Sequence, residues 1–169
     1  FDGAIFASIC EVGRGGIPNL WRNTIPLSYT HYLATPQVIQ EETIDKMKGL
    51  VRDFQTSLEE YTGEKLTKAK LQAAIEAHNE QRALVRALYD LRKPDPPLIS
   101  GVETLQVLKA IMGLPVNEGS ELLREVINEI KERKDGPTKK PTRLLLWGSC
   151  TDDTSFAEML ESLDANIVM

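Results

Sequence analysis

The stretch from Arg143 to Met169 constrains the fold of this chain more than any other. Leu144–Trp147 is a short apolar run typical of a buried strand, Gly148 ends it, and Asn166–Met169 is apolar again. Between the two runs, apolar side chains recur at helical spacing: Phe156, Met159, Leu160 and Leu163. The pattern predicts strand, loop, helix and strand, which is one βαβ unit of a parallel sheet.

The polar loop at 148–153 follows the carboxyl end of the first of these strands, which is where open parallel sheets bind ligands. Ser155 and Glu158 have the spacing of a capping box, with Asp153 as an alternative cap, so unpaired N–H groups of the helix face this loop. Asp152 and Asp153 form a carboxylate pair, and capping is a simpler interpretation of them than acid–base catalysis.

Composition narrows the classes of function. The chain has 169 residues and a net charge of −5, with Lys and Arg interleaved among Asp and Glu, which argues against a nucleic-acid partner. No apolar run is long enough to span a bilayer and no signal peptide is visible, so we expect no membrane partner. Only two cysteines occur, far apart in sequence, which argues against a disulfide framework and favours a cytoplasmic location.

The N-terminal region shows a second strand that is followed by a cysteine. Ala4–Ile9 is a short apolar run that predicts a buried strand, and Cys10 follows it as Cys150 follows Leu144–Trp147. The glycine-rich loop at 13–16 fits a tight turn, or a loop that directs N–H groups at an anion or at cluster sulfurs. Its spacing matches neither a P-loop nor a dinucleotide-binding fingerprint.

From about Glu41 to Lys134 the pattern is almost wholly helical, and caps and breakers divide it into four expected helices. The expected helices run from Glu41 to Gly63, from Thr67 to Arg92 or Lys93, from Ser100 to Ile111, and from Asn117 to a point before Gly136. Ser100 and Glu103 form a capping box at the start of the third. His78 falls on the apolar stripe of the second helix, so we expect a hydrogen-bonded core histidine. His31 has no partner at ligand spacing, and we expect no metal role for it.

Both ends of the chain fall in strand-like runs, and one βαβ unit cannot cover its own faces, so we expect a slice of a longer protein. The expected fold class is α/β, with Rossmann- or flavodoxin-like parallel-sheet pieces flanking a helical subdomain of about four helices. We expect residues 1–34 to end a first α/β domain, 35–140 to form the helical subdomain, and 141–169 to begin a second α/β domain.

The two cysteines at strand ends are the most unusual chemical feature. Iron–sulfur clusters with thiolate ligands usually take three or four cysteines, so a cluster here needs further ligands from outside this sequence. From the residues alone, a cluster and a purely structural role for the cysteines both stay open.

The chain carries, in order, three stretches that share one family pattern: the strand and cysteine at 4–10 with Trp21–Asn23 and Ile25–Pro26; then Leu58–Gly63, Leu88–Lys93 and Ile99–Gly101; and last Arg143–Ser149, Asp152–Asp153 and Ala165–Val168. Together they resemble the benzoyl-CoA reductase / 2-hydroxyacyl-CoA dehydratase family, and the resemblance covers nearly the whole chain. The family residue after the cysteine is usually Asp, whereas here it is Glu11.

The resemblance implies an iron–sulfur subunit, commonly with a 4Fe–4S cluster, that works with a homologous second subunit. It also implies an ATP-hydrolysing iron–sulfur activator that injects single electrons, and an acyl-CoA substrate that is dehydrated or reduced through a ketyl radical anion. On this basis Cys10 is expected to be a cluster ligand, Cys150 a second ligand or a residue beside the cluster, and Ser149 a contact of the acyl-CoA.

Two alternatives stay open beside this interpretation. One is a family member that reduces small molecules with a double-cubane cluster, and the other is a non-catalytic partner or scaffold subunit. The resemblance leaves open whether the reaction is dehydration or reduction, and we expect residues 1–169 to be inactive by themselves.

Overall fold

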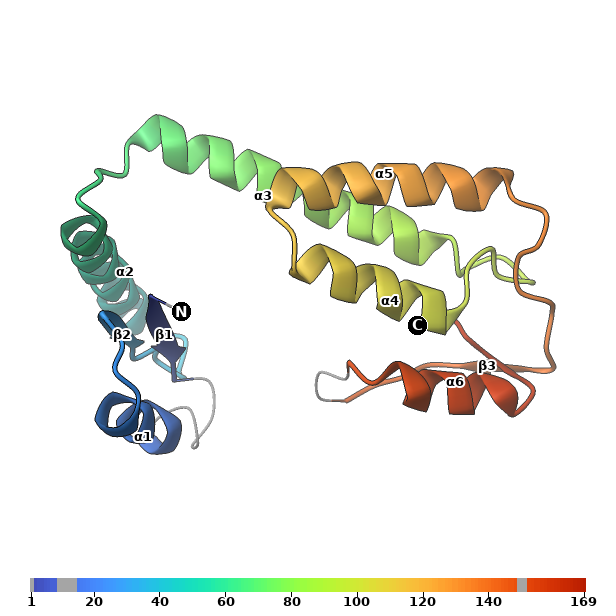
Figure 1. Cartoon of the computed structure of the whole chain (residues 1–169), viewed down its shortest axis with the longest axis horizontal. Coiled ribbons are helices and arrows are strands. Elements are labelled where there is room, and N and C mark those ends of the chain that lie inside the picture. The colour runs from blue at the N-terminus through green and yellow to red at the C-terminus, as the bar shows by residue number, and fades with distance from the viewer. Residues whose placement is uncertain (1, 9–14, 149–151) are drawn as a thin grey trace. The chain divides into compact units, whose positions relative to one another are not determined.

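The computed structural model describes residues 2–8, 15–148 and 152–169 (Figure 1). It divides into two compact units, Phe1–Lys68 and Ala69–Met169. Six helices and four short strands form in the described part, and the strands pair in parallel in two separate sheets. The predicted mixed α/β class is therefore confirmed.

The first unit is built on two parallel strands. β1 (Gly3–Ala7) pairs with β2 (Tyr29–Leu33) in the register Gly3 to Tyr29 through Ala7 to Leu33. Both strands are mostly half-buried, and the Ile5 side chain is 53% exposed. The expectation of a fully buried strand at 4–9 is wrong for the described part, because a two-stranded sheet leaves much of each face uncovered.

The crossover between these strands is α1 (Ile17–Thr24), a helix that the sequence analysis did not predict. Pro18 lies at its start, where a missing N–H costs nothing, and is the buried residue of the helix. The Trp21 ring makes an edge contact with the Phe6 ring at 6.0 Å between centroids, which ties the helix to β1. Strand, helix and parallel strand make this a second βαβ unit.

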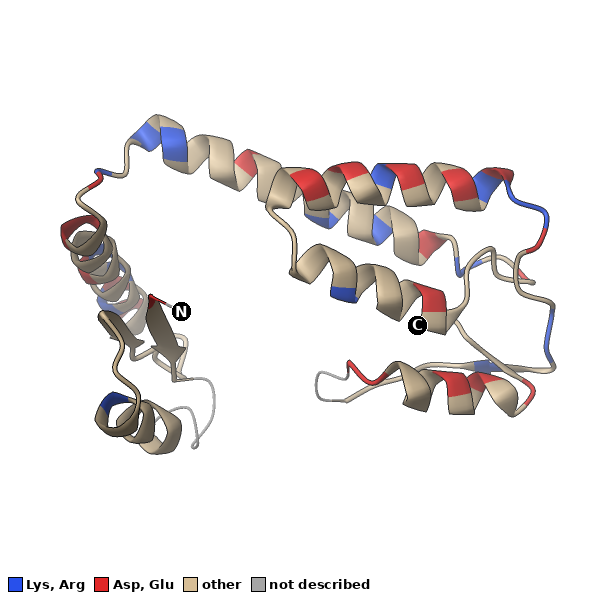
Figure 2. Cartoon of the chain, viewed as in Figure 1, with Lys and Arg blue, Asp and Glu red and all other residues tan. Residues whose placement is uncertain are grey.

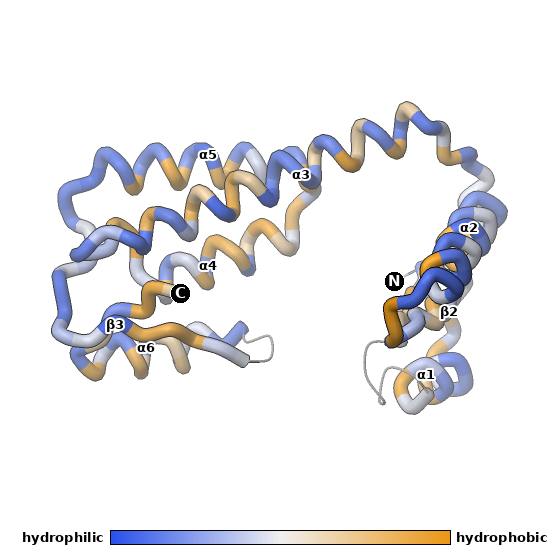
Figure 3. Tube along the Cα trace, turned by 180° about the vertical axis from the view of Figure 1, so that it is seen from behind, coloured by the Kyte–Doolittle hydropathy of each residue, from blue (hydrophilic) through white to orange (hydrophobic). Residues whose placement is uncertain are grey.

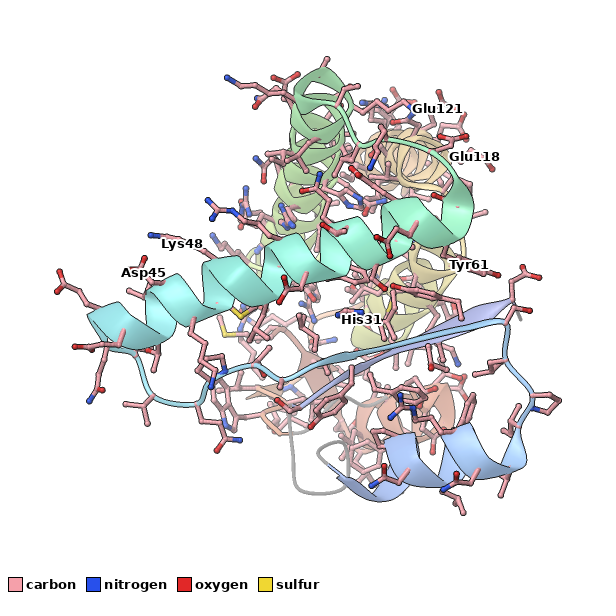
Figure 4. All side chains as sticks on the ribbon, turned by 90° about the vertical axis from the view of Figure 1, so that its left-hand side faces the viewer. His31, Asp45, Lys48, Tyr61, Glu118 and Glu121 are labelled. Carbon is pink, nitrogen blue, oxygen red and sulfur yellow. The ribbon has the colours of Figure 1, made fainter. Side chains whose placement is uncertain are left out.

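α2 (Glu41–Thr62) packs on β2 through aromatic rings, and Figure 4 shows His31 and Tyr61 between this helix and the strands. The Tyr61 ring stacks on Tyr29 at 4.7 Å, and the Phe54 ring lies 4.9 Å from His31. Asp45 and Lys48 of the same helix form an exposed ion pair. The predicted cap at Gly63 is confirmed, because this residue has a φ of 73° and ends the helix.

The second unit has a helical core of three helices, α3 (Lys68–Asp90), α4 (Gly101–Met112) and α5 (Val116–Glu132), seen side by side in Figure 1. Apolar side chains from these helices and from the connection between α3 and α4 fill it: Leu88, Leu91, Ile99, Ile111, Leu123, Ile127 and Ile130. Figure 3 shows hydrophobic residues alternating with hydrophilic ones along α5, as one buried helix face requires.

The core contacts the C-terminal half of α3 and leaves its first turns exposed. Leu71 and Ile75 are 46% and 45% exposed, and His78 is exposed as well. The prediction of a core histidine at 78 is therefore wrong. Periodicity identified the apolar side of the helix, but the described residues place no partner segment against this part of it.

The predicted βαβ unit at the C-terminal end is confirmed. β3 (Thr142–Leu144) pairs in parallel with β4 (Ala165–Ile167), and α6 (Thr154–Ser162) connects them. All three β4 residues are buried, but Leu145 and Trp147 are 56% and 93% exposed. The expectation that Leu144–Trp147 is buried is therefore wrong, again because two strands give each other little cover.

The start of α4 contacts β4 directly. A side-chain carbon added at Gly101 would lie 2.5 Å from Cβ of Ile167, so only glycine allows this approach. The Glu161 carboxylate of α6 accepts hydrogen bonds from the backbone N–H of Gly101 at 2.8 Å and of Ile167 at 3.3 Å. The predicted capping box of Ser100 and Glu103 is also confirmed. These contacts fix the strand pair against the helical core.

Charged residues of both signs are distributed along the helices, as Figure 2 shows for α5. The Arg124 guanidinium pairs with Glu80 of α3, and Lys139 pairs with Asp95 at 2.6 Å. Among the described residues, no helix combines the length and the apolar character needed to cross a bilayer.

Candidate functional site

The carboxyl ends of β3 and β4 form the edge where the sequence predicts a binding site. Backbone hydrogen bonds extend the ladder past the strands themselves: the Val168 N–H donates to the Leu144 carbonyl at 2.9 Å, and the Leu146 N–H donates to the Met169 carbonyl at 2.8 Å. The two chain segments therefore stay paired up to the point where the loop at 148–153 begins.

The far end of this loop is held by a cap and a lysine. The Asp153 carboxylate accepts a hydrogen bond from the Ser155 N–H at 3.0 Å and another from the Ser155 hydroxyl. These bonds lower the pKa of Asp153, so it stays ionised at the helix N-terminus. Lys109 Nζ on α4 donates to the Asp152 carbonyl at 2.8 Å. Asp153, the alternative in the sequence analysis, is thus the cap; the preferred assignment to Ser155 is wrong, because Ser155 already lies inside the helix.

A cavity of about 140 Å³ lies at this edge, between α4, α6 and the two strands. Apolar side chains make up most of its wall: Leu105, Leu108, Leu146, Phe156, Ala157, Ile167 and Met169. Phe156 and Met169 are 43% and 67% exposed, so they lie at the rim rather than at the base. The cavity can accept a small apolar group at a strand end.

Arg92 is the one cation in the lining of this cavity among the described residues, and only 7% of it is exposed. Its guanidinium lies over the Tyr89 ring, with 4.7 Å between the carbon and the ring centroid. Its buried Nε has no hydrogen-bond acceptor in the described part of the chain. Burial lowers the pKa of Arg92, but an arginine stays protonated at neutral pH, so the cavity carries a positive charge.

A second cavity lies on the other side of the α4 N-terminus, and unlike the first it is lined mostly by polar and charged residues. It has a volume of about 330 Å³ and contains Glu103, Arg133 and Lys140 in its lining. The Arg133 guanidinium donates to the Glu103 carboxylate at 2.6 and 3.0 Å and to the Leu98 carbonyl at 2.7 Å. The Arg133 guanidinium is the main cause that lowers the pKa of Glu103 to about 2. The charges here neutralise each other, which indicates a structural role.

The first unit has a comparable strand end at Ser8, which is 3% exposed. Its hydroxyl lies 3.0 Å from the Thr35 hydroxyl and 3.2 Å from the Thr35 carbonyl oxygen, and its N–H donates to the Leu33 carbonyl at 3.1 Å. The chain is therefore fixed at the residue that precedes the segment with Cys10.

The site residues that the sequence predicts, Cys10, Ser149 and Cys150, all lie outside the described residues. Their roles stay predictions. Within residues 2–8, 15–148 and 152–169, no group of three or more His, Cys, Asp or Glu side chains is arranged to hold a metal ion. His31 instead packs against Phe54 and Tyr29.

The sequence analysis did not single out Arg92 or Tyr89. A signal was present, because Arg92 follows the buried Leu88 by four positions and so continues the buried side of α3 past its last turn. A charged residue at such a position is unusual and indicates either a pairing or a binding role.

Comparison with known proteins identifies the family. A family model described as 2-hydroxyglutaryl-CoA dehydratase, D-component, matches residues 1–169. The chain belongs to this family. The resemblance in the sequence analysis is thereby confirmed, and the chain is one of a family of 2-hydroxyacyl-CoA dehydratase and benzoyl-CoA reductase subunits.

Two curated relatives fit the same assignment. This family member is 29% identical over 127 residues to a benzoyl-CoA reductase subunit of Thauera aromatica, covering 75% of the chain and 33% of the relative. It is 27% identical over 111 residues to the (R)-phenyllactyl-CoA dehydratase beta subunit of Clostridium sporogenes, covering 66% of the chain and 29% of the relative. The match spans about a third of the length of these relatives.

Proposed function

We propose that these residues are part of an iron–sulfur subunit that dehydrates or reduces an acyl-CoA thioester through a ketyl radical. The observation that carries the proposal is the family match over residues 1–169, together with two relatives whose names state an acyl-CoA dehydratase and a benzoyl-CoA reductase. Because the match spans about a third of each relative, we propose that the segment acts within a longer polypeptide and is inactive alone.

The cluster ligands that this chain contributes are Cys10 and Cys150 in our proposal. Thiolates are the donors that iron–sulfur clusters use, and both cysteines follow a strand. Two cysteines do not complete the usual ligand set of a 4Fe–4S cluster, so the remaining ligands come from elsewhere in the protein. When bound, the cluster supplies single electrons at low potential to the thioester carbonyl.

The described residues have two tasks in this proposal. The Ser8–Thr35 contact and the Lys109–Asp152 bond hold described residues that flank the two cysteine-containing segments. The apolar wall of the cavity at β3 and β4 keeps water away from the strand end, near which Ser149 contacts the acyl-CoA. Exclusion of water favours radical chemistry because it limits side reactions.

The proposed partners are a homologous second subunit, an ATP-dependent iron–sulfur activator protein and the acyl-CoA substrate, all in the cytoplasm. Both relatives are named as subunits, which supports the first of these partners. For the whole polypeptide we propose Rossmann- or flavodoxin-like domains flanking a helical subdomain, with boundaries near residues 34 and 140 of this numbering.

The test is iron and acid-labile sulfide analysis of the full-length protein, purified without oxygen and followed by assays with its activator, ATP and a panel of 2-hydroxyacyl-CoA and aryl-CoA thioesters. We expect iron and sulfide in near-equal amounts and turnover of one thioester class. Iron without thioester turnover would support the double-cubane alternative, and absence of iron would support the non-catalytic partner subunit.

A further inference from the structure

The cavity at the ends of β3 and β4 combines an apolar wall with one buried cation among the described residues, Arg92. Arg92 is more than nine-tenths buried, and its Nε has no acceptor among the described residues. A charge that is taken out of water without an ionic partner costs free energy, so folded proteins rarely keep one without a use.

The nearest compensation for this charge is incomplete. Stacking on Tyr89 covers one face of the guanidinium and leaves the buried Nε without an acceptor among the described residues. Glu161 is close enough to act on Arg92 through its charge, but its two oxygens accept hydrogen bonds from the backbone N–H groups of Gly101, Val102 and Ile167. Asp153, the acidic residue in the lining among the described residues, is engaged with Ser155.

The shape and chemistry of the cavity define the missing partner. At about 140 Å³ it is close to the roughly 150 Å³ cavities that hold a benzene-sized molecule. Its apolar wall suits one ring or a short alkyl chain, and the planar fork of an arginine suits a carboxylate, which accepts two hydrogen bonds from it.

We propose that this cavity binds a small carboxylic acid with an apolar body, whose carboxylate pairs with Arg92 and whose ring or chain lies against Leu105, Leu108 and Phe156. The site uses no cysteine and no iron. The same apolar wall shields the strand end in the proposed acyl-CoA reaction, but the carboxylate site needs neither cluster nor thioester, so its presence or absence does not decide that reaction.

The second cavity beside the α4 N-terminus serves as an internal contrast. Arg133 also has an Nε without an acceptor among the described residues, but the rest of its guanidinium is paired with Glu103 and Leu98. We expect no carboxylate ligand there, because the Glu103 carboxylate already pairs with the Arg133 guanidinium.

The test is equilibrium dialysis of the full chain against radiolabelled phenylacetate, with 2-phenylethanol and inorganic phosphate as competitors. We expect saturable binding of phenylacetate that neither competitor displaces at equal concentration. Arg92→Gln should weaken binding by about 10- to 100-fold, the range expected for loss of a charge-assisted pair. Arg86→Gln removes the same charge from an exposed position of α3, the helix that precedes Arg92, and should change the affinity less than about twofold.

Three results would overturn the proposal: no saturable binding, equal binding by Arg92→Gln, or displacement by phosphate as effective as by unlabelled phenylacetate. Circular dichroism establishes whether Arg92→Gln is folded. If that variant does not fold, the affinities of the unmodified protein for phenylacetate and for 2-phenylethanol are compared instead. Equal affinity for the two would exclude a carboxylate site.

Discussion

The two βαβ units of the chain share a topology but are held by different means. In the first, β1 and β2 lie against α2 through aromatic rings, with the Tyr29–Tyr61 centroids 4.7 Å apart. In the second, α4 approaches β4 at Gly101, where no space is left for a side-chain carbon, and a carboxylate of α6 binds the start of α4. The strands of the first pair are largely half-buried, whereas β4 is fully buried.

The same local topology can thus be supported by contacts that differ widely in how well they tolerate substitution. Stacked rings at a partly exposed surface can shift or be replaced at a small cost. The packing of Ile167 against the Gly101 backbone cannot, because a carbon added at Gly101 would lie 2.5 Å from Cβ of Ile167. The second unit should therefore be the more sensitive to substitution, and its strand end the more rigid of the two.

The strongest effect is expected at Gly101. Gly101→Ala places a carbon against Ile167 and should lower the free energy of unfolding by about 2–3 kcal/mol, measured by urea unfolding. Gly49→Ala in α2 is the matched control, because a carbon added there meets nothing within 4 Å. It should raise stability by about 0.5–1 kcal/mol through helix propensity. Equal effects at the two glycines would remove the contrast between the units.

A smaller effect is expected at Glu103, which caps α4 and pairs with Arg133. Its pKa is lowered to about 2 from the ordinary value of 4.5, so its stabilisation is complete above pH 4.5 and is lost as the pH falls through about 2. Because its side chain is 38% exposed, solvent screening reduces the contribution to about 1–2 kcal/mol at neutral pH.

Hydrogen exchange of the α4 amides at pH 7 and at pH 3 measures this contribution. Glu103→Gln should exchange faster than the unmodified chain at pH 7, and the difference should shrink at pH 3. Glu125→Gln, at an exposed position of α5, should change neither. A pH-independent difference at Glu103 would show that its charge does not stabilise the helix.

The weakest of these effects is expected at Tyr61 in the first unit. Tyr61→Leu removes the stacked ring and should cost about 0.5–1 kcal/mol in urea unfolding. Tyr61→Phe keeps the ring and removes only the 3.3 Å hydrogen bond to the Asp2 carbonyl, so it should be nearly neutral. A loss at Tyr61→Leu as large as that at Gly101→Ala would mean that both strand pairs are equally intolerant.

Local signals predicted much of the fold. The bounds of α2, its cap at Gly63, the capping box of Ser100 and Glu103, and the C-terminal βαβ unit all follow from short-range rules, and all are confirmed. α1 was missed although Pro18 and the spacing of Ile17, Leu20, Trp21 and Thr24 indicate a helix.

Burial was harder to predict than secondary structure, because it depends on neighbours that lie far away in sequence. The apolar side of α3 is clear from periodicity, yet His78 is exposed. In the same way, no short-range sequence rule predicts that Arg92 lies in an apolar cavity, because the walls of that cavity come from α4, α6 and the strand ends. The choice of Asp153 over Ser155 as cap depended on a shift of two residues in where the helix starts, which sequence patterns rarely fix.

The proposed function is tested at its centre by comparing Cys10→Ser and Cys150→Ser in the full-length protein, with iron content and visible spectrum measured after anaerobic purification. We predict that Cys10→Ser loses the cluster and that Cys150→Ser loses or spectrally perturbs it. Unchanged iron and an unchanged spectrum in Cys10→Ser would contradict the assignment of this thiolate as a ligand, and with it the proposed redox role of the first strand end.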